Sequence, residues 1–176
     1  YNSLIISFFA LECKFVKDKP FLYHLNNYLI HILCTALVFI FFQKMGVSIW
    51  WSGFGALLFG IHPMRVESVA WITERKDVLY ALFYLAALLS YLRYINEGKN
   101  RYIILTFFLF TLSLLSKIQA VALPLVLILL DVYFNRKIGL KAVLEKVIFF
   151  ASSLVIGILG STYAIKNAFV TTYSKA

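Results

Sequence analysis

Long runs of apolar residues constrain this chain more than any other feature of its sequence. The run at residues 21–42 would measure about 33 Å as a helix, which is enough to cross the hydrocarbon core of a bilayer. Comparable runs recur along the chain, so that 62% of its residues are hydrophobic and only 14% are charged. Soluble domains carry about a quarter charged residues. The pattern therefore predicts an all-α fold, a multi-pass bundle of transmembrane helices.

The breaks between these runs predict about six membrane spans with interfacial helices among them. Pro20 suits the first turn of a span, and His62-Pro63 ends the next one because proline disfavours helix in the residue before it. Residues 102–134 would reach about 50 Å as one helix, so we expect a turn near residues 116–119. The expected spans are residues 21–42, 49–61, 78–92, the two halves of 102–134, and 147–165. The expected interfacial helices are residues 2–16 and 64–77, with an amphipathic lead-in at Lys141–Lys146.

Residues 1–176 are expected to form one partial membrane domain. The chain has no initiator methionine, and nothing at its start reads as a signal peptide. We therefore expect that it lacks its N-terminus and its C-terminus. Its two cysteines, Cys13 and Cys34, have no metal-ligand spacing, so the sequence predicts no metal site.

The net charge of +9 indicates basic loops beside anionic lipid headgroups, and it argues against a nucleic-acid partner. Alternating the spans puts eight basic residues on one face and nine on the other, so the positive-inside rule does not decide the orientation. We interpret the first face as cytoplasmic because its connectors contain few acids, and the second, mixed-charge face as a working surface. The basic residues of the first face are Lys44, Arg93, Lys99, Arg101, Arg136, Lys137, Lys141 and Lys146.

The densest charge in the chain follows His62-Pro63. Ionisable residues beside a bilayer must pair, reach the aqueous surface or bind a ligand. Arginine suits phosphate because its planar guanidinium binds two oxygens at once. One interpretation is a site for an anionic ligand, in which basic side chains bind the ligand and acidic side chains orient the basic ones. The other interpretation is a solvated interfacial helix with internal salt bridges. The candidate residues are His62, Arg65, Glu67, Arg75, Lys76 and Asp77.

Two smaller groups of polar residues interrupt the apolar runs. Lys117 and Gln119 lie at the predicted turn, on the face of the charged helix, where Lys117 either joins a phosphate site or simply reaches water. His24, Asn27 and His31 form one helix stripe. This stripe is typical of hydrogen bonding between membrane helices, and metal binding or proton relay is the alternative.

Three segments of the chain resemble the TMTC-like family, membrane proteins with tetratricopeptide repeats that are related to the protein O-mannosyltransferases. The most specific is His62-Pro63 followed by Glu-Ser-Val-Ala-Trp at 67–71 and Arg-Lys-Asp-Val-Leu at 75–79. The helix before it, with His24, Asn27 and His31, and the segment 114–131 after it, with Lys117 and Asp131, are also similar. The isoleucine- and lysine-rich character looks more like a bacterial member.

This resemblance implies a GT-C fold and an enzyme that transfers a sugar from a polyprenyl-phosphate carrier to an acceptor hydroxyl, with a protein among the candidate acceptors. It places Arg75, Asp77 and Lys117 on the lipid-phosphate side, and it implies a bacterial inner-membrane protein whose working face is periplasmic. The family's usual catalytic acid belongs to an external loop upstream of this chain, so the general base is unknown. The repeats that follow the membrane domain in the family are also outside this chain.

Two other functions fit the residues. The polar stripe of His24, Asn27 and His31 is the motive for a transporter or flippase of a lipid-linked or anionic solute. Because no general base can be assigned among these residues, a non-catalytic scaffold that anchors a repeat domain is the third hypothesis.

Overall fold

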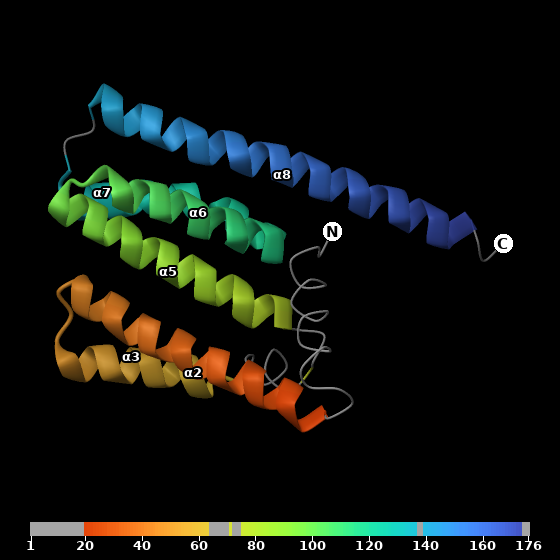
Figure 1. The fold of residues 1–176 in the computed structure, drawn as a ribbon, viewed down its shortest axis with the longest axis horizontal. Coiled ribbons are helices and arrows are strands. Elements are labelled where there is room, and N and C mark those ends of the chain that lie inside the picture. The colour runs from red at the N-terminus through yellow and green to blue at the C-terminus, as the bar shows by residue number, and fades with distance from the viewer. Residues whose placement is uncertain (1–19, 64–70, 72–74, 137–138, 174–176) are drawn as a thin grey trace. The chain divides into compact units, whose positions relative to one another are not determined.

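The structure is a computed structural model that describes residues 20–63, 71, 75–136 and 139–173. All regular structure in these residues is helical, with six α-helices and one 3₁₀-helix (Figure 1). The all-α expectation is therefore confirmed for the described part of the chain. The interfacial helix expected at residues 2–16 lies outside the described residues, as do Arg65 and Glu67.

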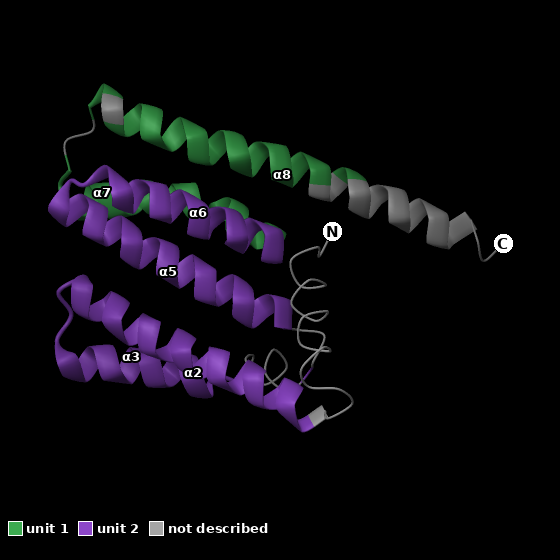
Figure 2. Cartoon of the chain, in the orientation of Figure 1, with its two compact units in different colours: residues 1, 118–176 green, residues 2–117 purple. Residues whose placement is uncertain are grey.

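The helices form two compact units, which are described separately (Figure 2). The described residues 20–117 make up the N-terminal unit. Its helices pack in the order α3, α2, α5, α6, and each contacts the next. The helices are α2 Pro20–Lys44, α3 Ile49–Ile61, α5 Arg75–Glu97 and α6 Asn100–Ser116.

Glycine lets α3 approach α2 closely. A methyl group on Gly55 would lie 2.8 Å from the ring of Phe42, and one on Gly60 would lie 3.3 Å from Thr35. Small residues at such contacts are the usual means of packing helices in a membrane, where van der Waals contact replaces the hydrophobic effect. The imidazole Nε2 of His31 lies 3.0 Å from the carbonyl oxygen of Gly60 and adds a polar contact to the same interface.

Short hydroxyl side chains connect α5 with α6. The Ser90 hydroxyl donates to the Tyr102 carbonyl at 3.0 Å, and the Ser113 hydroxyl donates to the Tyr80 carbonyl at 3.2 Å. The first contact joins the end of α5 to the start of α6, and the second joins the start of α5 to the end of α6. The two helices are therefore antiparallel neighbours along most of their length.

The C-terminal unit contains η2 Ile118–Ala122, α7 Leu123–Tyr133 and α8 Leu140–Tyr173. Pro124 lies in the first turn of α7, where its missing N–H breaks no helical hydrogen bond. The hydroxyl of Ser153 in α8 donates to the carbonyl of Val121 in η2 at 3.4 Å. The unit is thus held partly by a hydrogen bond to the short 3₁₀ segment.

A group of four charges, two of them buried, joins α7 to α8. The ammonium of Lys146 lies 2.8 Å from one carboxylate oxygen of Asp131, and both side chains are less than a tenth exposed. The guanidinium of Arg136 lies 3.5 Å from Asp131 and 3.0 Å from Glu145. Two acids thus neutralise two bases in a setting where an unpaired charge would be costly.

Three described helices are long and apolar enough to cross a membrane, namely Phe21–Lys44, Arg75–Glu97 and Ala142–Leu159. Three shorter apolar helices, Ile49–Ile61, Asn100–Ser116 and Ile118–Tyr133, occupy the positions of the other expected spans. The helices fit a membrane protein, whereas the count of six spans stays a prediction.

Several expected helix boundaries agree with the structure, while others differ, such as the end of α5, which lies at Glu97 and not at residue 92. α2 begins at Pro20, α3 ends before His62, and α6 ends before Lys117, as expected. However, Arg75, Lys76 and Asp77 form the first turn of α5 and not the end of an interfacial helix. The lead-in expected at Lys141–Lys146 is likewise continuous with the following span in α8.

We expect Asp131→Ala to lower the free energy of unfolding by about 3 to 5 kcal/mol, because Lys146 would remain buried without its nearest counter-charge. Denaturant titration of the intact protein in detergent would measure the change. Replacing both partners, with Asp131→Leu and Lys146→Met, should cost less than Asp131→Ala alone. Glu97→Gln is the control, since it removes an exposed carboxylate. Equal losses for Asp131→Ala and Glu97→Gln would contradict a structural role for the buried pair.

Candidate functional site

Asp77 and Lys117 meet at one end of the N-terminal unit. The Lys117 ammonium donates to Asp77 Oδ1 at 2.6 Å, across 40 residues of sequence. Asp77 lies in the first turn of α5, where a carboxylate also interacts favourably with the helix dipole. Lys117 follows the last residue of α6, and its backbone is extended. The ends of two antiparallel helices therefore bring together two residues that the sequence analysis placed in separate motifs.

This ion pair is accessible. The side chain of Asp77 is 18% exposed and that of Lys117 is 25% exposed. An ammonium has three N–H donors, and Asp77 accepts from one, so donors remain for the oxygens of an anion. The carboxylate in turn fixes the direction of the lysine side chain, which is otherwise long and mobile. The pair can therefore present an oriented positive charge to a phosphate group.

Arg75 lies two residues away but is engaged differently. Its side chain is buried, with the residue only 3% exposed. Its Nε donates to Asn27 Oδ1 at 2.8 Å, its Nη2 donates to the Tyr23 carbonyl at 3.0 Å, and the guanidinium carbon lies 5.7 Å from the centre of the Tyr23 ring. These contacts hold the start of α5 against α2. Arg75 thus joins two helices at the position where the sequence analysis expected a ligand for phosphate.

The polar stripe of α2 serves the same packing. Asn27 is fully buried, and besides accepting from Arg75 it donates to the carbonyl of Trp71 at 3.3 Å. His31 contacts Gly60 of α3, and its ring stacks on Phe59 at 5.7 Å between ring centres. His24, at the start of the stripe, is exposed. Hydrogen bonding between helices, the first of the two interpretations of this stripe, is thus observed for Asn27 and His31.

The other predicted site residues lie at separate positions. His62 is exposed and follows the last residue of α3, while Lys76 is half-buried in the first turn of α5. Gln119 is exposed in η2 and belongs to the C-terminal unit. Within the described residues, no three His, Cys, Asp or Glu side chains are placed to hold a metal ion. The structure therefore brings together Asp77 with Lys117, and Arg75 with Asn27.

The contact between Asn27 and Arg75 was not predicted from the sequence. A polar residue inside an apolar helix needs a partner, and a basic residue at the start of another long helix was available. Applied to both motifs at once, this requirement could have paired Asn27 with Arg75.

We expect Asn27→Ala to lower the free energy of unfolding by about 1.5 to 3 kcal/mol, because the buried Arg75 would lose a hydrogen-bond acceptor. Denaturant titration of the intact protein in detergent would measure it. His24→Ala, on the same helix but exposed, is the matched control and should have little effect. If the two variants lose the same stability, the contact does not hold α2 against α5.

Comparison with known proteins agrees with the resemblance in these motifs. The chain is 32% identical over 126 residues to human "Protein O-mannosyl-transferase TMTC3", which covers 69% of this chain and 13% of that protein. It is 31% identical over 152 residues to mouse "Protein O-mannosyl-transferase TMTC2", a match that covers 84% of this chain and 18% of that protein. It is 34% identical over 132 residues to Drosophila melanogaster "Protein O-mannosyl-transferase Tmtc1", a match that covers 75% of this chain and 15% of that protein.

The other two comparisons found no similarity. No family model matches the chain, and no solved structure matches it. The chain spans between 13% and 18% of the length of the three relatives named above. Over that portion, the sequence similarity supports a TMTC-like relationship for this chain.

Proposed function

We propose that this chain is part of a membrane glycosyltransferase of GT-C type, similar to the protein O-mannosyltransferases. The enzyme would transfer a sugar from a polyprenyl-phosphate carrier to an acceptor hydroxyl, with a protein as one possible acceptor. Three of its relatives are named protein O-mannosyl-transferases, and three apolar helices of the chain suit a bilayer. The observation that carries the proposal is the accessible ion pair of Asp77 and Lys117.

The reaction explains why such a pair is useful. A bond forms between the acceptor oxygen and the anomeric carbon of the sugar, and the bond from that carbon to the carrier phosphate breaks. Negative charge develops on the departing lipid phosphate, and a fixed cation stabilises it most where water is excluded. In this proposal Lys117 stabilises the leaving phosphate and Asp77 positions Lys117. Arg75 positions the turn of α5 that carries Asp77.

The acceptor hydroxyl also has to lose a proton to a base. We infer that a carboxylate outside this chain takes it, and that tetratricopeptide repeats accompany the membrane domain in the intact protein. We further propose a bacterial inner-membrane location, with the end of the N-terminal unit that carries Asp77 and Lys117 facing the periplasm.

The contacts of the polar stripe favour the transferase over the transporter. Asn27 and His31 are buried and hydrogen-bonded between helices. A relay or solute site on this stripe would need these groups to exchange partners with the solute. The stripe therefore supplies packing, and its residues give no separate support for transport.

We expect Lys117→Gln to reduce kcat for sugar transfer by about 100-fold or more, because the leaving phosphate would lose a fixed charge. Asp77→Asn should also reduce kcat, since Lys117 would lose the group that orients it. The assay follows mannose moving from polyprenyl-phosphate mannose to a Ser/Thr-containing peptide, using the intact protein in lipid.

Lys99→Gln is the matched control, because it removes a lysine from the opposite end of the same unit. Thermal unfolding of each variant separates loss of activity from loss of fold. Unchanged transfer by a folded Lys117→Gln variant would contradict the assigned role of the ion pair. Absence of transfer by the unmodified protein, with every donor sugar tried, would contradict the proposed activity itself.

A further inference from the structure

A cavity lies between the last turns of α2 and α5, at the end of the N-terminal unit opposite Asp77 and Lys117. Its volume is about 370 Å³. Its apolar part is formed by side chains from both helices, and its rim carries two basic residues. The apolar residues are Leu37, Ile40, Leu89 and Leu92, and the basic ones are Lys44 and Arg93. The cavity therefore combines a positive rim with an apolar floor.

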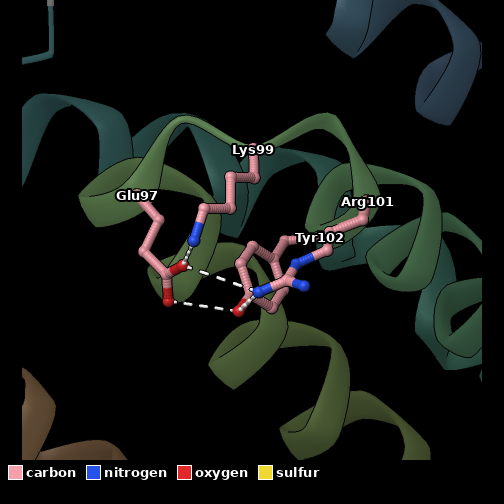
Figure 3. A network of polar contacts seen from close by, with 4 residues as sticks. All are labelled: Glu97, Lys99, Arg101 and Tyr102. Atoms are coloured by element: carbon pink, nitrogen blue, oxygen red, sulfur yellow. Dashed lines mark hydrogen bonds and ion pairs between the residues drawn. The ribbon is translucent and has the colours of Figure 1, made fainter.

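The two cations of the rim are not neutralised. Lys44 and Arg93 are both exposed, and neither forms a hydrogen bond or an ion pair with any residue in the described part of the chain. Glu97 is the one acidic residue that lines the cavity. Its carboxylate is directed instead towards the connector between α5 and α6 (Figure 3).

Three side chains contact the carboxylate of Glu97. Lys99 donates to Glu97 Oε2 at 2.7 Å, the Tyr102 hydroxyl donates to Glu97 Oε1 at 3.1 Å, and the Arg101 guanidinium lies 3.8 Å from Oε2. The Arg101 guanidinium also donates to the Tyr102 hydroxyl at 2.7 Å (Figure 3). Because Glu97 is engaged in this network, the charges of Lys44 and Arg93 remain available to an anion from outside.

The position of the cavity indicates which anion. Lys44 is the last residue of the candidate span Phe21–Lys44, and Glu97 is the last residue of the candidate span Arg75–Glu97. The rim therefore lies where hydrocarbon gives way to headgroups, and the apolar floor lies on the hydrocarbon side. Basic pockets between membrane helices at this depth suit anionic headgroups. A free phosphate ion would gain nothing from the four apolar side chains.

We propose that this cavity binds an anionic phospholipid. The lipid phosphate is held between the Lys44 ammonium and the Arg93 guanidinium, whose planar fork binds two phosphate oxygens. Asn96, which also lines the cavity, offers amide N–H donors to the headgroup. The first carbons of the acyl chains contact Leu37, Ile40, Leu89 and Leu92. The site is about 24 Å along α5 from Asp77, and it does not depend on the proposed transferase activity.

Titration of the intact protein in detergent with phosphatidylglycerol, followed by native mass spectrometry, tests the proposal. We expect phosphatidylglycerol to bind more tightly than phosphatidylcholine, whose headgroup has no net charge. Lys44→Gln and Arg93→Gln should each weaken binding about fivefold, and the double variant about 25-fold. The charge-conserving changes Lys44→Arg and Arg93→Lys should retain most of the affinity.

Lys99→Gln and Arg101→Gln, made singly, are the matched controls. Each removes one positive charge from the same end of the unit without touching the cavity lining, and each leaves Glu97 a cation and the Tyr102 hydroxyl as partners. They should change binding less than twofold. Equal weakening by all four substitutions would overturn the site in favour of general surface charge. Equal binding of the two lipids, or displacement of phosphatidylglycerol by equimolar sn-glycerol 3-phosphate, would also overturn it.

Discussion

Polar groups buried among apolar helices have to find their partners within the protein, because lipid offers none. The described part of this chain meets that constraint fully, since no buried side-chain nitrogen or oxygen in it lacks a hydrogen bond. In the N-terminal unit, Asn27 and Arg75 satisfy each other across α2 and α5. In the C-terminal unit, Asp131 and Lys146 do so across α7 and α8. These contacts contribute to specifying which helices lie side by side, because apolar surfaces alone can pack in many ways.

The same constraint explains which charges remain available for ligands. At one end of the N-terminal unit, Arg75 is buried and hydrogen-bonded to α2, while the Asp77–Lys117 pair stays partly exposed. At the other end, Glu97 forms ion pairs with Lys99 and Arg101 and accepts a hydrogen bond from Tyr102. Lys44 and Arg93 stay exposed. Formal charge counted along the sequence does not distinguish these cases. The distinction depends on which neighbours the fold supplies to each side chain.

Local features of the sequence were sufficient for several helix boundaries but not for the contacts between helices. Pro20 and His62-Pro63 act on the backbone of adjacent residues, so their effect could be predicted directly. The start of α5 was placed three residues too late because Arg75 and Asp77 look like surface charges when they are considered alone. Their partners lie 48 and 40 residues away, and no short-range pattern encodes such distances. The resemblance to the TMTC-like family did place Asp77 and Lys117, together with Arg75, on the lipid-phosphate side, although it gave no indication that Asp77 and Lys117 form a pair.

The side chains of Arg75 and Asp77 contact different neighbours for a simple geometric reason. Successive residues of an α-helix are rotated by about 100°, so residues i and i+2 point to nearly opposite sides. Arg75 accordingly contacts α2, whereas Asp77 contacts Lys117 at the end of α6. One helical turn therefore fixes α5 against two neighbours with side chains of opposite charge. Since the same rigid turn carries both residues, a displacement of α2 that moves Arg75 must also move Asp77. The buried contact of Arg75 with Asn27 thus helps to place the partly exposed pair of Asp77 and Lys117.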